Sequence, residues 1–288
     1  MIQPPEMKET HPIKLHDGGV GTTTEVLEML SASYAGELDR VVELADHNPR
    51  LLTCQYDYTS PLHLAVREGH IELVRFFIER GALDRSYRTH PFLDSLITVA
   101  DDREFVDIKQ LLQQALATPE LTREWGDTGA IDFEKDETQT RFQQLVNDQQ
   151  HDEVEAMLRE RPELALDETA FWGEGILAMP AKDGDHQMLE ILMAHGARCP
   201  DISKWGARYY FKNYVTARFL LERSMNPNHM NWRGFTLLHD MAYTGDLAKA
   251  RLLIEHGADV DRIDDEYRST PLGYAAHVGE MLRWSSSC

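Results

Sequence analysis

Residues 60–82 read SPLHLAVREGHIELVRFFIERGA, and residues 236–258 read TLLHDMAYTGDLAKARLLIEHGA. The two stretches align without a gap, and each has His in its fourth place, Gly in its tenth and a Gly-Ala pair at its end. Residues 175–197 (GILAMPAKDGDHQMLEILMAHGA) keep both glycine places, and residues 270–280 (TPLGYAAHVGE) keep the first part of the pattern. Because such a unit recurs at a period of about 33 residues, the sequence predicts an array of stacked modules.

Each module carries the local signals of two short helices. Ser60 can cap the first helix with its hydroxyl, and Pro61 stands in a first turn that needs no amide donor. In the second helix, apolar residues such as Leu73 and Phe77 fall on one face. A single helix pair cannot bury that face, so neighbouring pairs stack. Glycines that can end these helices with positive φ are Gly69, Gly81, Gly184, Gly196, Gly245, Gly257 and Gly279.

The residues Ser60-Pro61-Leu62-His63-Leu64-Ala65 resemble the T-P-L-H-x-A signature of the ankyrin repeat, here in a degenerate, bacterial-type form. The resemblance implies an all-α ankyrin-repeat solenoid of stacked helix-turn-helix modules with short hairpin fingers. It also implies that His63 and His239 bond the backbone between adjacent modules, instead of binding metal. The period predicts eight modules, which start near Leu27, Ser60, Leu93, Arg141, Gly175, Ser203, Thr236 and Thr270.

The spacing of the modules also predicts the domain organisation. Residues 1–23 are expected to be a flexible leader, residues 24–116 modules 1–3, residues 117–139 a long acidic loop, and residues 140–279 modules 4–8. Residues 280–288 lack the apolar second helix of a module. Three interpretations of this end stay open: a truncated product, an atypical short cap, or an edge that another chain completes.

The amino-acid composition restricts the kinds of partner and the location that fit this chain. Lys and Arg total 29 against 49 Asp and Glu, which gives a formal charge of −20. Such a charge opposes binding to nucleic acid or anionic lipid, and favours a partner protein with a basic surface. The three cysteines, Cys54, Cys199 and Cys288, do not form a disulfide framework, so we expect a reducing, cytoplasmic location. No apolar run reaches the roughly 20 residues of a membrane-spanning helix.

The sequence shows no motif for catalysis or cofactor binding. It lacks H-E-x-x-H, C-x-x-C, G-x-S-x-G and Walker motifs. We therefore expect no enzyme activity, no metal and no cofactor. Two alternatives remain: an enzyme or small-ligand protein with a pocket near residues 186–210, lined by His186, Trp205, Tyr209 and the long loop, or a self-associating structural array.

The expected function is protein–protein binding through the finger tips and the inner-helix face. Aromatic residues and Arg dominate binding hot spots, and they are enriched at the predicted finger tips. Stacking between neighbouring fingers is an equal alternative for these residues. On the inner helices, the module near Ser203 offers Arg208, Tyr209 and Tyr210. The predicted partner-binding residues of the fingers are Tyr56, Asp57, Tyr87, Arg88, Trp172, Trp232, Arg233 and Tyr267.

Overall fold

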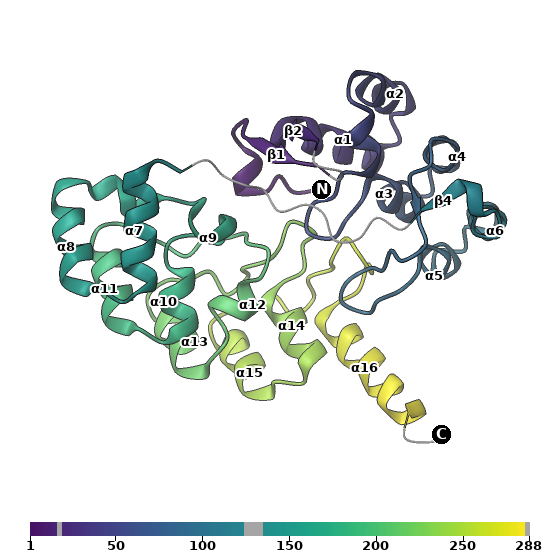
Figure 1. Cartoon of the computed structure of the whole chain (residues 1–288). Helices are drawn as coiled ribbons and strands as arrows, with labels where there is room; N and C mark the ends of the chain where they lie inside the picture. The colour runs from purple at the N-terminus through teal and green to yellow at the C-terminus, as the bar shows by residue number, and fades with distance from the viewer. Residues whose placement is uncertain (16–18, 124–134, 286–288) are drawn as a thin grey trace. The chain divides into compact units, whose positions relative to one another are not determined.

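A computed structural model describes residues 1–15, 19–123 and 135–285. These residues belong to two compact units, one of residues 7–134 and one of residues 1–6 together with 135–288. Helices in each unit come in antiparallel pairs joined by short turns (Figure 1), which confirms the predicted all-α fold of helix-turn-helix modules.

In the unit of residues 7–134, the described residues form three helix pairs. Its first helices pack neighbour on neighbour, α1 on α3 and α3 on α5, and the second helix α4 packs on α6. A short antiparallel pair, β1 and β2, precedes α1, and a parallel pair is formed by β3 and β4. The elements are η1 Pro5–Met7, which starts in the other unit, β1 Pro12–Lys14, β2 Val20–Thr22, α1 Thr23–Ala35, α2 Leu38–His47, η3 Pro49–Thr53, α3 Pro61–Glu68, α4 Ile71–Glu79, β3 Leu83–Asp84, α5 Leu96–Asp102, α6 Val106–Leu116, η4 Pro119–Leu121 and β4 Thr122–Arg123.

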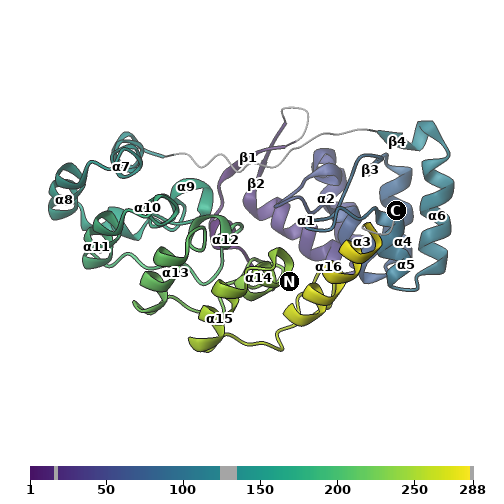
Figure 2. The same cartoon turned by 90° about the horizontal axis from the view of Figure 1, so that it is seen from below.

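The described residues of the unit that contains residues 135–288 form four helix pairs and two further helices, α9 and α16. The first helices α7, α10, α12, α14 and α16 follow one another in contact, as do α8 with α11 and α13 with α15 among the second helices (Figure 2). A continuous apolar core runs between the modules. The elements are α7 Glu137–Asn147, α8 His151–Glu160, η5 Pro162–Leu166, α9 Ala170–Gly173, α10 Ala178–Asp183, α11 His186–Ala194, α12 Gly206–Tyr209, α13 Tyr214–Leu221, α14 Leu237–Thr244, α15 Leu247–Glu255 and α16 Pro271–Ser285.

Local signals read from the sequence explain where the regular helices begin and end. The Ser60 hydroxyl accepts a hydrogen bond from the His63 amide at 3.1 Å and caps α3. At the turn after α3, Gly69 takes φ 83°, a left-handed conformation that costs other residues energy. The other five module glycines of the predicted set also have φ between 73° and 97°: Gly81, Gly184, Gly196, Gly245 and Gly257.

The first helix of each unit begins earlier than predicted. Helix α1 starts at Thr23 instead of near Leu27, and α7 starts at Glu137 instead of near Arg141. Both helices open with a capping box, in which the N-cap side chain and a Glu or Gln three residues later bond reciprocally. This local device adds a turn that the repeat pattern does not contain.

The segments predicted as a leader and as a loop contain regular structure where the structure describes them. Within residues 1–23 lie η1, β1 and β2, and within residues 117–139 lie η4, β4 and the start of α7. Residues 124–134 of the predicted acidic loop lie outside the described residues.

Gly279 does not form the turn that the repeat predicts. It lies inside α16, which continues to Ser285 as one helix. An internal glycine costs a helix only about 1 kcal/mol. A glycine ends a helix when the residues after it are more stable packed in another direction. Among the described residues, no second helix follows α16.

Candidate partner-binding surface

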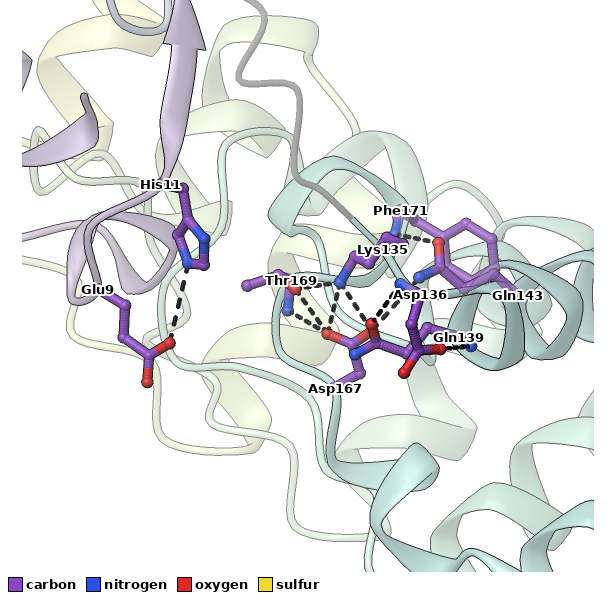
Figure 3. Close-up of polar contacts among 9 residues, drawn as sticks. All are labelled: Glu9, His11, Lys135, Asp136, Gln139, Gln143, Asp167, Thr169 and Phe171. Atoms are coloured by element: carbon purple, nitrogen blue, oxygen red, sulfur yellow. Dashed lines mark hydrogen bonds and ion pairs between the residues drawn. The ribbon is translucent and has the colours of Figure 1, made fainter. Parts of the chain in front are cut away.

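The connection between α8 and α10 forms a finger whose base is held by a half-buried carboxylate. Asp167 accepts hydrogen bonds from Lys135 Nζ at 2.8 and 2.9 Å and from the Thr169 amide at 3.0 Å (Figure 3). Gln143 on α7 adds a bond from its Nε2 to Asp167 at 3.3 Å, and its Oε1 accepts the Phe171 amide at 3.4 Å. The described end of the predicted acidic loop, Lys135, is therefore tied to this finger.

The tip of this finger has a backbone conformation that side chains rarely adopt. Phe171, Trp172 and Gly173 have φ values of 49°, 64° and 84°, so three successive residues are left-handed. Positive φ is unfavourable for a bulky side chain. The Phe171 side chain is buried, whereas Trp172 is 58% exposed. The backbone conformation of the tip thus directs one aromatic ring inward and presents the other to solvent.

Hydrogen bonds from the next module hold the tip in place. Lys204 Nζ donates to the Trp172 carbonyl oxygen at 2.6 Å and also lies 3.2 Å from the Glu6 carboxylate. The Trp205 amide donates to the Glu174 carboxylate at 3.1 and 3.3 Å. Residues 172–174 and residues 204–205 are therefore neighbours across two modules.

Below this surface lies a buried polar cluster. Burial raises the pKa of the Glu174 carboxyl to about 7, although Lys204 opposes that shift. The Glu174 carbonyl accepts a hydrogen bond from the Tyr210 hydroxyl. Ser203 Oγ lies 2.9 Å from His229 Nε2, and burial lowers the pKa of His229 to about 4. The cluster fixes the junction between the finger and the module of α12.

The exposed Arg208 guanidinium lies over the ring of Trp205. The Arg208 guanidinium carbon lies 5.7 Å from the centroid of the Trp205 ring, and both side chains are exposed. Trp172, Trp205 and Arg208 come from a finger and the adjoining inner helix. They are called the Trp172 surface below.

Among the predicted partner-binding residues, four are buried within the chain: Tyr56, Tyr87, Trp232 and Arg233. Partner binding through these four residues stays a prediction. The Tyr87 hydroxyl lies 2.7 Å from His63 Nδ1 and donates to the Tyr58 carbonyl oxygen at 2.7 Å, so it joins successive fingers. Arg233 faces the Glu266 carboxylate at 3.9 Å. Their burial favours the alternative in which finger aromatics stiffen the array.

The other predicted finger residues have mixed surroundings. Asp57 is half-buried at a turn with φ 46°, and Tyr267 packs edge-on against Tyr274 with ring centroids 5.8 Å apart. Arg88 is exposed, and its Nη1 donates to the carbonyl oxygens of Arg85 and Tyr87. Trp172 is the predicted aromatic of this set that is mainly exposed.

The repeated histidines connect adjacent modules. His239 Nε2 lies 3.1 Å from the Ser269 carbonyl oxygen of the following module, which matches the backbone contact implied by the repeat. His63 Nδ1 lies 2.7 Å from the Tyr87 hydroxyl, which belongs to the neighbouring finger. Within the described ranges no group of three His, Cys, Asp or Glu residues is arranged to hold a metal ion.

The residues of the alternative pocket do not share one environment. His186 stacks on Phe219 at 4.4 Å and contacts the Thr216 hydroxyl at 3.1 Å. Tyr209 is buried, as is Tyr210, so neither faces a partner. Trp205 is exposed, and the Arg208 guanidinium carbon lies 5.7 Å from the centroid of its ring.

Sequence reasoning missed the polar support of the surface. Glu6, Glu174 and Lys204 are brought together from the N-terminal segment, a finger and the connection that leads into α12. None of them occupies a signature position of the repeat, and Glu6 lies far from its partners in sequence. The one local sign of this polar cluster in the sequence is the pair of glycines on either side of Glu174.

Comparison with known protein families supports the repeat architecture. The family model of the ankyrin repeat matches residues 57–89 and 233–265. The chain thus carries ankyrin repeats, a protein–protein interaction module that is typically non-enzymatic. A 97-residue part is 37% identical to the "Protein fem-1 homolog A-like" of Mus musculus. That part covers 33% of this chain and 14% of the mouse protein. Among the described helices, none is long and apolar enough to span a membrane.

Proposed function

We propose that this chain is a cytoplasmic, non-catalytic scaffold that binds another protein through the Trp172 surface. The single observation that carries the proposal is the exposed Trp172 ring at the tip of a left-handed, hydrogen-bonded finger. Left-handed non-glycine residues cost about 1–3 kcal/mol each, and such strain is concentrated at functional sites. The conformational strain of the finger tip is explained if the exposed Trp172 ring contacts the partner protein.

The chemistry of the surface supports the same function. Trp and Arg are enriched in the few interface residues that carry most of the binding energy. Trp172 and Arg208 lie on adjacent modules. Lys204 holds the backbone of Trp172, and the Trp205 ring lies beside the Arg208 guanidinium. A ring with few rotatable bonds, held on a rigid support, loses little entropy when a partner binds.

The contacts do not favour catalysis. Ser203 and His229 are hydrogen-bonded like a nucleophile and its base, but both side chains are buried. The Pro200 carbonyl oxygen lies 2.6 Å from His229 Nδ1, and the pKa of the imidazole falls to about 4, too low for a general base near neutral pH. We assign this pair to the support of the finger.

The test is affinity capture from the native host with the wild type, Trp172→Ala and Leu247→Ala, read by mass spectrometry. Leu247 is the matched control because it is an apolar residue, 80% exposed, on the second helix α15. A protein captured by the wild type and the control, but lost with Trp172→Ala, is the expected result. If every captured protein is retained by Trp172→Ala, the proposed binding surface is wrong.

A further inference from the structure

We infer that the segment of the partner that contacts the Trp172 surface is an acidic peptide with an apolar or aromatic residue beside its carboxylate. This inference rests on the proposed function and adds the chemistry of the partner. It follows from the charge at the surface, which differs in sign from the charge of the whole chain.

Arg208 supplies the exposed positive charge. It lies on α12, its guanidinium carbon lies 5.7 Å from the centroid of the Trp205 ring, and among the described residues no carboxylate is within ion-pair distance of it. A contact with a ring face uses none of the N–H donors of the guanidinium. Those donors match the two oxygens of a carboxylate.

The carboxylates nearest to this surface are turned inward. Glu6 and Glu174 are buried, and both lie beside Lys204. Their charge is partly balanced by that ammonium group, and the raised pKa of Glu174 keeps part of its population neutral near pH 7. A ligand that approaches Trp172 and Trp205 from solvent therefore meets the Arg208 cation first.

The net charge of −20 by itself favours a basic partner. However, exposed charges are screened over about 10 Å at 0.1 M salt, so contacts at one surface depend on the local groups. The two indole rings supply apolar area for a neighbouring side chain of the peptide. Arg208 and the indoles together select a carboxylate next to an apolar group.

Phosphate and bases of single-stranded nucleic acid could use the same residue types. The chain charge opposes this ligand, because a nucleic acid carries many phosphates and would extend past one arginine into an acidic surface. We therefore commit to a peptide and keep nucleic acid as an outcome of the test.

The experiment measures binding of the purified full chain to two peptide sets of equal length. Each peptide carries a Phe or Leu, flanked by Asp and Glu in one set and by Lys and Arg in the other, and an oligo-dT strand is the third probe. The variants are Arg208→Glu, Arg208→Ala and Trp172→Ala. Thermal unfolding of each variant checks that the fold is retained.

We expect the wild type to retain the acidic set, with affinity that falls as salt rises. Arg208→Ala should lose about tenfold, and Arg208→Glu should change the preference to the basic set. Trp172→Ala should weaken binding to both sets. The inference is overturned if the wild type prefers the basic set or oligo-dT, binds no probe, or keeps its preference in Arg208→Glu. If the captured partner still depends on Trp172 in those cases, only the inferred chemistry fails. Retention of every captured protein by Trp172→Ala would instead reject the proposed function.

Discussion

Lys204 Nζ donates a 2.6 Å hydrogen bond to the carbonyl oxygen of Trp172, the exposed residue at the finger tip. The same ammonium group lies 3.2 Å from the carboxylate of Glu6, which is buried. One side chain thus connects the N-terminal segment, a finger and the module of α12. The orientation of the Trp172 ring depends on an interaction outside its own finger.

Replacing Lys204 with Met should lower both stability and partner binding. The change leaves the buried Glu6 carboxylate without this cation, a loss that typically costs about 3 kcal/mol or more, and it frees the Trp172 carbonyl. Thermal unfolding and capture of the partner measure the two effects. Lys212→Met, at an exposed lysine, is the control and should resemble the wild type. Equal stability of the two variants would contradict this role of Lys204.

Glu174 should make stability fall with rising pH between about 4.5 and 7. The folded-state pKa of Glu174 is raised by burial from 4.5 to about 7, so in this window the folded protein holds a proton that the unfolded chain has released. The expected loss is on the order of 3 kcal/mol across the window, with no further change from this group above pH 7. The substitution Glu174→Gln should remove this pH-dependent loss of stability.

Other groups titrate in the same range, so the difference between wild type and Glu174→Gln is the informative quantity. His229, whose pKa is lowered to about 4, gives the opposite slope below pH 6.5, and Asp240, whose pKa is raised to about 7, gives the same slope as Glu174. Denaturant unfolding at several pH values measures the difference. The control Glu160→Gln, at an exposed residue, should leave the slope unchanged. A pH-independent difference for Glu174→Gln would contradict the assignment.

His239→Ala should destabilise the stacking of α14 on the following module. The substitution removes the bond between Nε2 and the Ser269 carbonyl oxygen, and it takes away the Nδ1 acceptor of the buried Thr236 amide, at a cost of about 1–3 kcal/mol. Hydrogen exchange of the amides of α14 and α16 should increase. His277→Ala, at an exposed residue of α16, provides the comparison. Unchanged protection in His239→Ala would show that the contact contributes little.

The described cysteines should react with thiol reagents only when the chain opens. Burial raises the pKa of the Cys199 thiol to about 12 and that of Cys54 even further, so neither forms a thiolate near neutral pH. Labelling at each site, followed by mass spectrometry, should be slow in the native protein and fast in denaturant. Rapid native labelling of Cys54 would show that its module opens readily. Cys288 lies outside the described residues.

Much of the fold follows from local signals that the sequence displays. Ser60 and Thr236 occupy the predicted N-caps, and Gly69 and Gly245 the predicted left-handed turns, because these positions depend on single residues and near neighbours. Gly279 lies inside α16 instead of ending it, because a glycine costs a helix interior only about 1 kcal/mol and does not by itself end a helix.

The candidate site was only partly predictable. Trp172 and Arg233 occupy equivalent places, each three residues before the start of its module, yet Trp172 is 58% exposed and Arg233 is 7% exposed. The difference depends on backbone conformation and on contacts between distant segments. Lys204 reaches Trp172 across two modules, and no spacing in the sequence indicates that contact.

The most direct test of the account is the dissociation constant of the captured partner for the purified wild type and Trp172→Ala, measured by titration calorimetry. Loss of a Trp hot spot is expected to weaken binding by about thirtyfold, which corresponds to about 2 kcal/mol. The thermal unfolding temperature should stay the same, because the ring is mainly exposed. An unchanged dissociation constant would contradict the assignment of Trp172 as the anchor.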